Sequence, residues 1–193
     1  ALEIMRHTQV THKSALFMLH RIRWAMAPAL EEAQPLDGVV EADETYVGGK
    51  PRYRGVSKRG RGTAKTPVFA CVQRGGGVRV KVIANVTSST LQQAIREVTA
   101  PTATVVTDEL ASYNGVGEGF VGGHHTVNHG SGEYVRKLTD SMVIHTNSAE
   151  GFFSLVKRGI HGIYHAVSKR HLHRYMSEFA WRYTIRDLND GER

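Results

Sequence analysis

The spacing of hydrophobic residues predicts two helices at the start of the chain. A short helix is expected over residues 2–7, and apolar side chains at 15, 16, 19, 22 and 26 then recur at helical spacing behind Thr11, a suitable N-cap. The pair is helix-turn-helix-like over 1–27, although any amphipathic helical hairpin has the same pattern. The chain opens inside the first helix without an initiator Met, so we expect a truncated element from a longer protein.

Extended patterns follow a linker over 28–37. Apolar runs predict strands over 39–47, 67–73, 78–86, 104–107 and near 124–128. Helical spacing predicts helices from the cap residues Ser88 and Ser89 to about Val98, over 147–158 and over 168–186. This order predicts an α/β fold over 38–186, with 187–193 as a tail. A strand meander followed by a βα crossover suits a ribonuclease-H-like mixed sheet flanked by helices.

Composition excludes several classes of protein. The single cysteine, Cys71, cannot form an intramolecular disulfide, and no apolar run approaches the ~18 residues of a membrane span. No signal-peptide pattern opens the chain, so we expect a soluble cytoplasmic protein. Zinc-type Cys/His spacing, a P-loop and a nucleophile elbow are all absent from the sequence.

The charge favours a polyanionic partner, nucleic acid before membrane. Twenty-five Lys and Arg oppose eighteen Asp and Glu, for a net charge of +7. Two tracts, 50–65 and 157–177, contain no acid, which favours contact with a phosphate backbone over a merely solvated loop. The residues that we expect to contact DNA are Lys13, Arg21, Lys50, Arg52, Arg54, Lys58, Arg59, Arg61, Lys65, Arg158, Lys169, Arg170 and Arg174.

Two aspartates occupy positions where a purely structural acid is unfavourable. Asp43 lies inside an otherwise apolar and branched strand, and Asp108 stands where a short apolar strand stops. Asp108 could instead simply begin a turn. Carboxylates on strands of one sheet can converge on a divalent cation, and oxygen ligands suit Mg²⁺ or Mn²⁺. Glu44 is expected to point to the face opposite Asp43.

The helix over 147–158 is expected to pack by an aromatic face and to present a polar stripe. Ala149, Phe152, Phe153 and Val156 share one face, and Asn147, Glu150, Ser154 and Lys157 share the other. Such a stripe could serve a metal and a phosphate from one surface. The alternative is a solvated face on which Asn147 caps the helix and Glu150 completes a capping box.

Three segments resemble one family of enzymes. The strings VVEADETYVGG, VVTDELASYNG and HTNSAEGFFSLVKRGIHGIYHAVSKRHLHRYMSEFAWRYTIR are similar to bacterial insertion-sequence transposases of the ISXO-like type, in the DDE superfamily. The resemblance covers residues 39–186. Phe153 stands where Trp is common in the family and Thr184 where Asn is common, away from the expected chemistry.

The resemblance implies metal-dependent phosphoryl transfer on DNA with two Mg²⁺ or Mn²⁺ ions. Asp43 and Asp108 match the first two carboxylates of the family. Members of the family have an Asp-Asp-Asn-Lys or an Asp-Asp-Glu-Lys pattern. Both Asn147 and Glu150 lie in the segment that matches the third active-site residue, and the sequence of this segment is closer to the Asn type. Lys157 follows Glu150 by seven residues, the usual Glu–Lys spacing. Members cleave transposon ends and join them to target DNA.

The expected partners are terminal repeats and target DNA, in a homodimer or larger assembly associated with the bacterial nucleoid. Two other functions fit the same residues. An inactive or domesticated transposase would bind DNA without catalysis, and a nuclease of the same fold would cut DNA without joining it. A plain α/β domain, in which these polar residues are all structural, is the remaining alternative.

Overall fold

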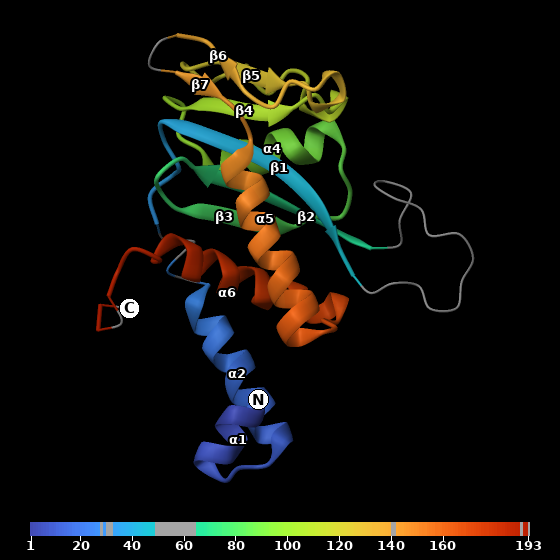
Figure 1. Ribbon diagram of the computed structural model, residues 1–193, viewed down its shortest axis with the longest axis vertical. Coiled ribbons are helices and arrows are strands. Elements are labelled where there is room, and N and C mark those ends of the chain that lie inside the picture. The colour runs from blue at the N-terminus through green and yellow to red at the C-terminus, as the bar shows by residue number, and fades with distance from the viewer. Residues whose placement is uncertain (28, 30–32, 49–64, 140–141, 190, 193) are drawn as a thin grey trace, which may run out of the picture.

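A five-stranded sheet forms the centre of the molecule (Figure 1). The computed structural model describes residues 1–193 except 28, 30–32, 49–64, 140–141, 190 and 193. The strand order is β3-β2-β1-β4-β5. The strands are β1 (Val39–Val47), β2 (Thr66–Gln73), β3 (Val78–Val82), β4 (Thr104–Asp108) and β5 (His124–Val127).

Strand directions confirm the mixed, ribonuclease-H-like sheet. β1, β2 and β3 are antiparallel neighbours, and β1, β4 and β5 run parallel. The turn between β2 and β3 includes Gly75 at φ 68°, a left-handed conformation that favours glycine. β3 is shorter than the expected 78–86 and ends at Val82, before the chain turns toward the next helix.

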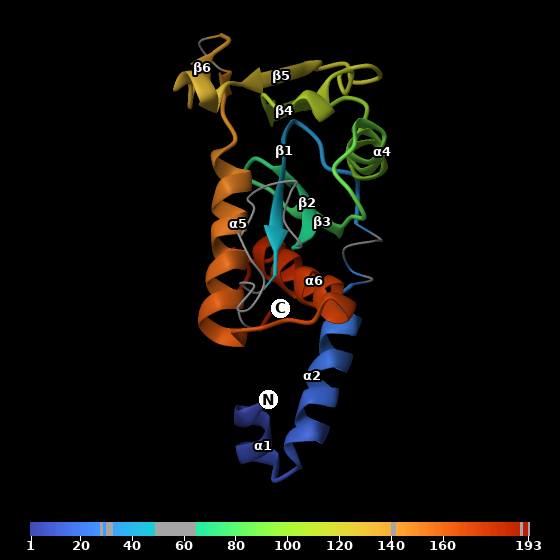
Figure 2. The same cartoon turned by 90° about the vertical axis from the view of Figure 1, so that its right-hand side faces the viewer.

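Helices cover both faces of this sheet, as Figure 2 shows. On one face, α4 (Ser88–Val98) packs Leu91 and Ile95 into a cluster with Val40, Ala42 and Phe69. On the other, α5 (Asn147–Gly159) and α6 (Leu172–Thr184) pack against alternate residues of β2. The predicted aromatic face of α5 is confirmed, because Phe152 and Phe153 are buried in this second cluster.

Several boundaries differ from the expected ones. The cap of α4 is Thr87, whose hydroxyl accepts the Thr90 N–H, so Ser88 is the first helical residue. α6 begins at Leu172, where its apolar spacing begins, and the polar residues before it form a 3-10 turn, η5 (Lys169–His171). A π-helical turn, η4 (Ile160–Tyr164), extends α5. β6 (Arg136–Lys137) and β7 (Val143–Ile144) are too short to produce a period in the sequence.

The two N-terminal helices are α1 (Leu2–Thr8) and α2 (His12–Met26), and Thr11 caps α2 as expected. α1 lies at the end of the molecule away from the sheet (Figure 2). In the described part of the chain, no helix is long and apolar enough to span a membrane.

A buried ion pair joins α2 to α6. Arg23 Nε lies 2.7 Å from Glu178 Oε2, and both side chains are more than nine-tenths buried. The Tyr164 hydroxyl donates to the same carboxylate oxygen, and the Arg23 guanidinium lies 4.1 Å from the centroid of the Tyr175 ring. Removing one member of a buried pair leaves an uncompensated charge, which costs about 3–5 kcal/mol.

We therefore expect Glu178→Ala to lower the free energy of unfolding by about 3–5 kcal/mol, measured by urea denaturation. Arg182→Ala is the matched control, because Arg182 binds Glu178 from the exposed side and its loss should cost about 1 kcal/mol or less. The double variant Arg23→Met/Glu178→Leu should recover much of the loss, since apolar side chains replace the pair. Equal losses of unfolding free energy in Glu178→Ala and Arg182→Ala would show that the buried pair with Arg23 contributes no more than the exposed pair with Arg182.

Candidate active site

Asp43 and Asp108 lie on the neighbouring parallel strands β1 and β4. The register of β1 and β4 pairs Val39 with Thr104 and Glu41 with Val106. The hydrogen-bonded pairing ends at Glu41 and Val106, and strand alternation places Asp43 and Asp108, two residues further along each strand, on the same face of the sheet. The structure thus brings together two carboxylates that are 65 positions apart in the sequence.

The environment of Asp43 is strongly acidic. Burial raises the pKa of its carboxyl from 3.8 to about 7, and the charges of Glu44, Asp108 and Glu150 add to the increase. The Glu44 N–H, 2.7 Å from Asp43 Oδ1, opposes this increase in pKa. A site that retains a proton near neutral pH is suited to accept a cation in place of that proton.

Glu150 and Asn147 lie in the first turn of α5, and both are exposed. The capping-box interpretation of these two residues is wrong. Thr146 is the N-cap and makes no side-chain cap bond, and Asn147 is already inside the helix. Both side chains are therefore released from the capping role that the local sequence allowed.

Helix α5 is instead capped by Glu41 from β1, a residue that the sequence reasoning missed. The buried Glu41 Oε2 accepts the N–H groups of Ser148 at 2.7 Å and Ala149 at 3.1 Å. Its Oε1 accepts from Arg74 Nε at 2.7 Å. The signal was present, because Glu41 is an acid inside an apolar strand, as Asp43 is, and faces the same side.

Arg74 extends this network to the segment before the helix. Its two terminal nitrogens donate to the carbonyl oxygens of Val143 and His145, at 2.5 and 3.0 Å. The His145 Nδ1 lies 3.2 Å from Glu41 Oε1. One buried carboxylate and one guanidinium thus hold the approach and the first turn of α5 against β1.

Glu44 points away from this site, as expected. Its Oε2 accepts the hydroxyl of Tyr113 at 2.7 Å, and Tyr113 is buried in the cluster beneath α4. The alternation along β1 therefore delivers Glu41 and Asp43 to the face of α5 and Glu44 to the opposite face.

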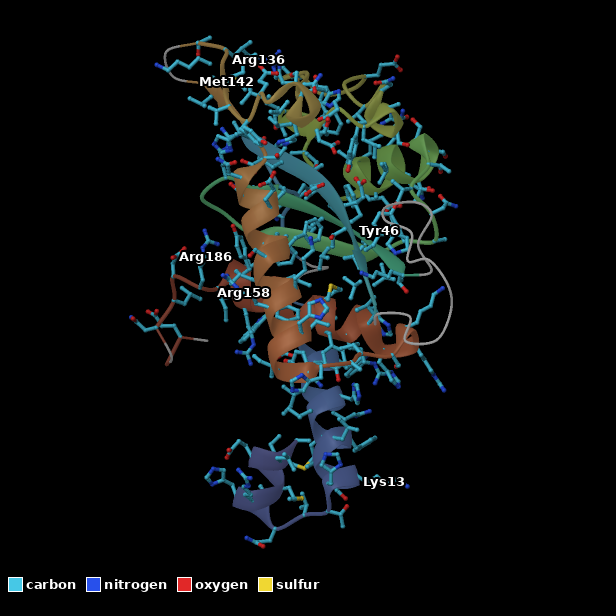
Figure 3. The ribbon with its side chains drawn as sticks, turned by 45° about the vertical axis from the view of Figure 1, so that its right-hand side comes forward. Lys13, Tyr46, Arg136, Met142, Arg158 and Arg186 are labelled. Atoms are coloured by element: carbon cyan, nitrogen blue, oxygen red, sulfur yellow. The ribbon has the colours of Figure 1, made fainter. Side chains whose placement is uncertain are left out.

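The expected DNA contacts are distributed over several elements. Lys157 and Arg158 are exposed on α5, Lys169 and Arg170 on η5, and Lys13 and Arg21 on α2. Arg174 on α6 is half-buried, and Lys65 precedes β2. Figure 3 shows Arg158 beside α5 and Lys13 on α2, well apart in the molecule. The remaining expected contacts lie outside the described residues: Lys50, Arg52, Arg54, Lys58, Arg59 and Arg61.

Residues 35–184 match the family model of the ISXO2-like transposase domain. The chain belongs to this family. The match spans the whole sheet and helices α4, α5 and α6. Comparison with curated proteins and with solved structures gave no match.

The donor set of this transposase domain fits a divalent metal held by few protein ligands. Among the described residues, no three His, Cys, Asp or Glu side chains are grouped closely enough to hold a metal ion. Mg²⁺ typically keeps several waters and binds through one or two carboxylates together with substrate phosphates. The Asp43–Asp108 pair, open toward α5, provides such carboxylates.

The raised pKa of Asp43 predicts how stability depends on pH in the metal-free domain. Because the folded pKa of about 7 exceeds the ordinary 3.8, stability is fully present below pH ~4 and falls as pH rises through 7. Asp43→Asn removes this dependence and should become more stable than the original chain by about 2 kcal/mol at pH 8. Urea denaturation in EDTA from pH 4 to 8 measures the difference, with the exposed Asp187→Asn as control. If the free energy of unfolding varies with pH in the same way for Asp43→Asn and the original chain, the raised pKa of Asp43 is overturned.

The cap on α5 predicts a local effect of changing Glu41. Glu41→Ala leaves two helix N–H groups and Arg74 without their acceptor and should cost about 3–5 kcal/mol. Hydrogen exchange should show the first turn of α5 losing protection more than α4 does. Glu97→Ala, which breaks an exposed pair with Lys81, should cost less than about 1 kcal/mol. Unchanged protection of α5 in Glu41→Ala would show that the cap is dispensable.

Proposed function

We propose that this chain is a metal-dependent transposase that cleaves DNA at transposon ends and transfers the cut strand into target DNA. The observation that carries the proposal is that Asp43 and Asp108 lie on neighbouring parallel strands, on the face of the sheet against which α5, the helix of Glu150 and Asn147, packs. Membership of the ISXO2-like transposase family supports phosphoryl transfer on DNA as the reaction at this acidic face.

Asp43 and Asp108 are the residues that would hold two Mg²⁺ or Mn²⁺ ions. Bound there, such ions supply Lewis-acid activation of a water or 3′-hydroxyl and stabilise charge on the phosphate. Asp43 must release the proton that its raised pKa retains before its carboxylate can bind a cation. The buried cap sets the first turn of α5, which carries Glu150 and Asn147, against the strand of Asp43.

We assign the third ligand to Glu150, with Asn147 tested beside it. The charge of Glu150 is one of the contributions to the raised pKa of Asp43, which supports a place for its carboxylate near that aspartate. A carboxylate oxygen is also a harder and more strongly attracting ligand for Mg²⁺ than an amide oxygen.

Lys157 is positioned to bind a phosphate of the same DNA. It lies two turns after Glu150 on the exposed stripe of α5. In the part of the chain that the structure describes, no hydrogen bond or ion pair occupies its ammonium group, which leaves it available as a point charge. Arg158 and the basic residues of η5 and α2 would extend the contact along the phosphate backbone.

Carboxylate removal should separate catalysis from DNA binding. Asp43→Asn and Asp108→Asn should each lower Mn²⁺-dependent nicking of supercoiled plasmid by at least about 100-fold. Duplex binding, measured by fluorescence anisotropy, should stay within about threefold, because the change removes negative charge. The exposed Glu118→Gln is the control and should nick normally.

The same assay decides among the alternatives. Binding without nicking in the original chain would indicate an inactive transposase, and nicking without joining of a 3′ end to target DNA would indicate a nuclease. Loss of nicking in Glu150→Gln but not in Asn147→Ala supports Glu150 as the third ligand. The reverse result transfers that role to Asn147.

A further inference from the structure

The loop after β5 is tied to the residue that follows Asp108. The carboxylate of Glu109 accepts the backbone N–H groups of His129 and Gly130, each at 3.0 Å. These residues begin η3 (His129–Ser131). The end of β4 therefore fixes the backbone of His129, although 20 positions separate it from Glu109.

The imidazole of His129 reaches the first turn of α5. Its Nε2 lies 3.1 Å from Thr146 Oγ1 and 3.7 Å from Glu150 Oε1. The ring of Tyr134 packs against it edge-on, with centroids 5.3 Å apart. The His129 side chain is three-quarters buried, whereas that of Glu150 is more than half exposed.

These contacts form a second connection within the acidic site. Glu41 joins the strand of Asp43 to α5, and the Glu109–His129 connection joins the strand of Asp108 to the same helix. Only the second connection reaches a candidate ligand side chain directly, because His129 faces Glu150 itself.

We propose that His129 is a positioning residue that orients the Glu150 carboxylate toward Asp43 and Asp108 for binding of a divalent cation. The inference rests on the proposed function and names a residue that acts through Glu150. An imidazole that is held by Thr146 and lies against one oxygen of Glu150 leaves the other oxygen free for the cation and reduces the rotamers that Glu150 must lose. Loss of such an outer partner typically weakens metal affinity by about 10–100-fold.

The test measures Mn²⁺ binding to the full chain by electron paramagnetic resonance of free Mn²⁺. His129→Phe preserves the bulk of the ring without a donor and should weaken Mn²⁺ binding about tenfold. His129→Gln, whose amide N–H reaches a similar position, should restore most of the affinity. His125→Phe, on β5, is the matched control and should bind as the original chain does.

A second comparison separates positioning from general support of the fold. In a Glu150→Gln background, His129→Phe should cause no further loss of Mn²⁺ affinity, because its effect passes through the carboxylate. A further loss of the same size would overturn the proposal. If His129→Phe does not fold, His129→Asn, whose shorter amide falls short of Glu150, provides the same comparison.

The outcomes distinguish this inference from the proposed function. Failure of the original chain to bind Mn²⁺ or nick plasmid counts against the metal-dependent transposase itself. If His129→Phe binds Mn²⁺ as the original chain does, while Asp43→Asn loses Mn²⁺-dependent nicking as expected, only the role of His129 is overturned.

Discussion

The candidate site depends on one buried carboxylate. Glu41 is fully buried, and an ionised carboxylate in such a place is tolerated only when hydrogen bonds and opposite charge compensate for lost hydration. Two N–H groups of α5 and the Arg74 guanidinium provide that compensation. The helix gains an anion at its positive end in return. Because Glu41 precedes Asp43 by two residues on the same face, the contact that stabilises the helix also sets its distance from the catalytic candidate.

The alternation of β1 then divides its acids between two environments. Glu41 is paired with Arg74, and Glu44 accepts a hydrogen bond from Tyr113 on the opposite face. Burial raises the pKa of Asp43 to about 7, and the charges of Glu44, Asp108 and Glu150 add to the increase. The fold thus groups acidic side chains near one point of a protein whose net charge is +7. Such a point attracts a divalent cation, and the surrounding positive charge attracts the polyanion on which that cation would act.

The periodicity of apolar residues predicted most of the elements, because elements such as β1, α4 and α5 are long enough for the apolar pattern to recur. It could not predict β6 and β7, which have two residues each. The alternation of β1 correctly placed Glu44 opposite Asp43, whereas the pairing of Asp43 with Asp108 depends on a strand register that no local pattern encodes. The capping box failed for a related reason: Asn147 and Glu150 satisfy a local rule, but the tertiary contact from Glu41 had already satisfied the helix N–H groups. Glu109 and His129 were missed because their contacts join distant segments.

Arg23 and Glu178 apply the same physical principle at the other end of the molecule. A buried ion pair contributes little to stability compared with apolar side chains of the same size, but it accepts few alternative geometries. Arg23 on α2 binds Glu178 on α6, and Tyr164 and Tyr175 contact the same pair. Glu41 likewise links α5 to β1. Both buried charges therefore connect elements that are distant in the sequence: one joins the helix that carries Glu150 to the strand of Asp43, and the other joins the basic helix α2 to α6.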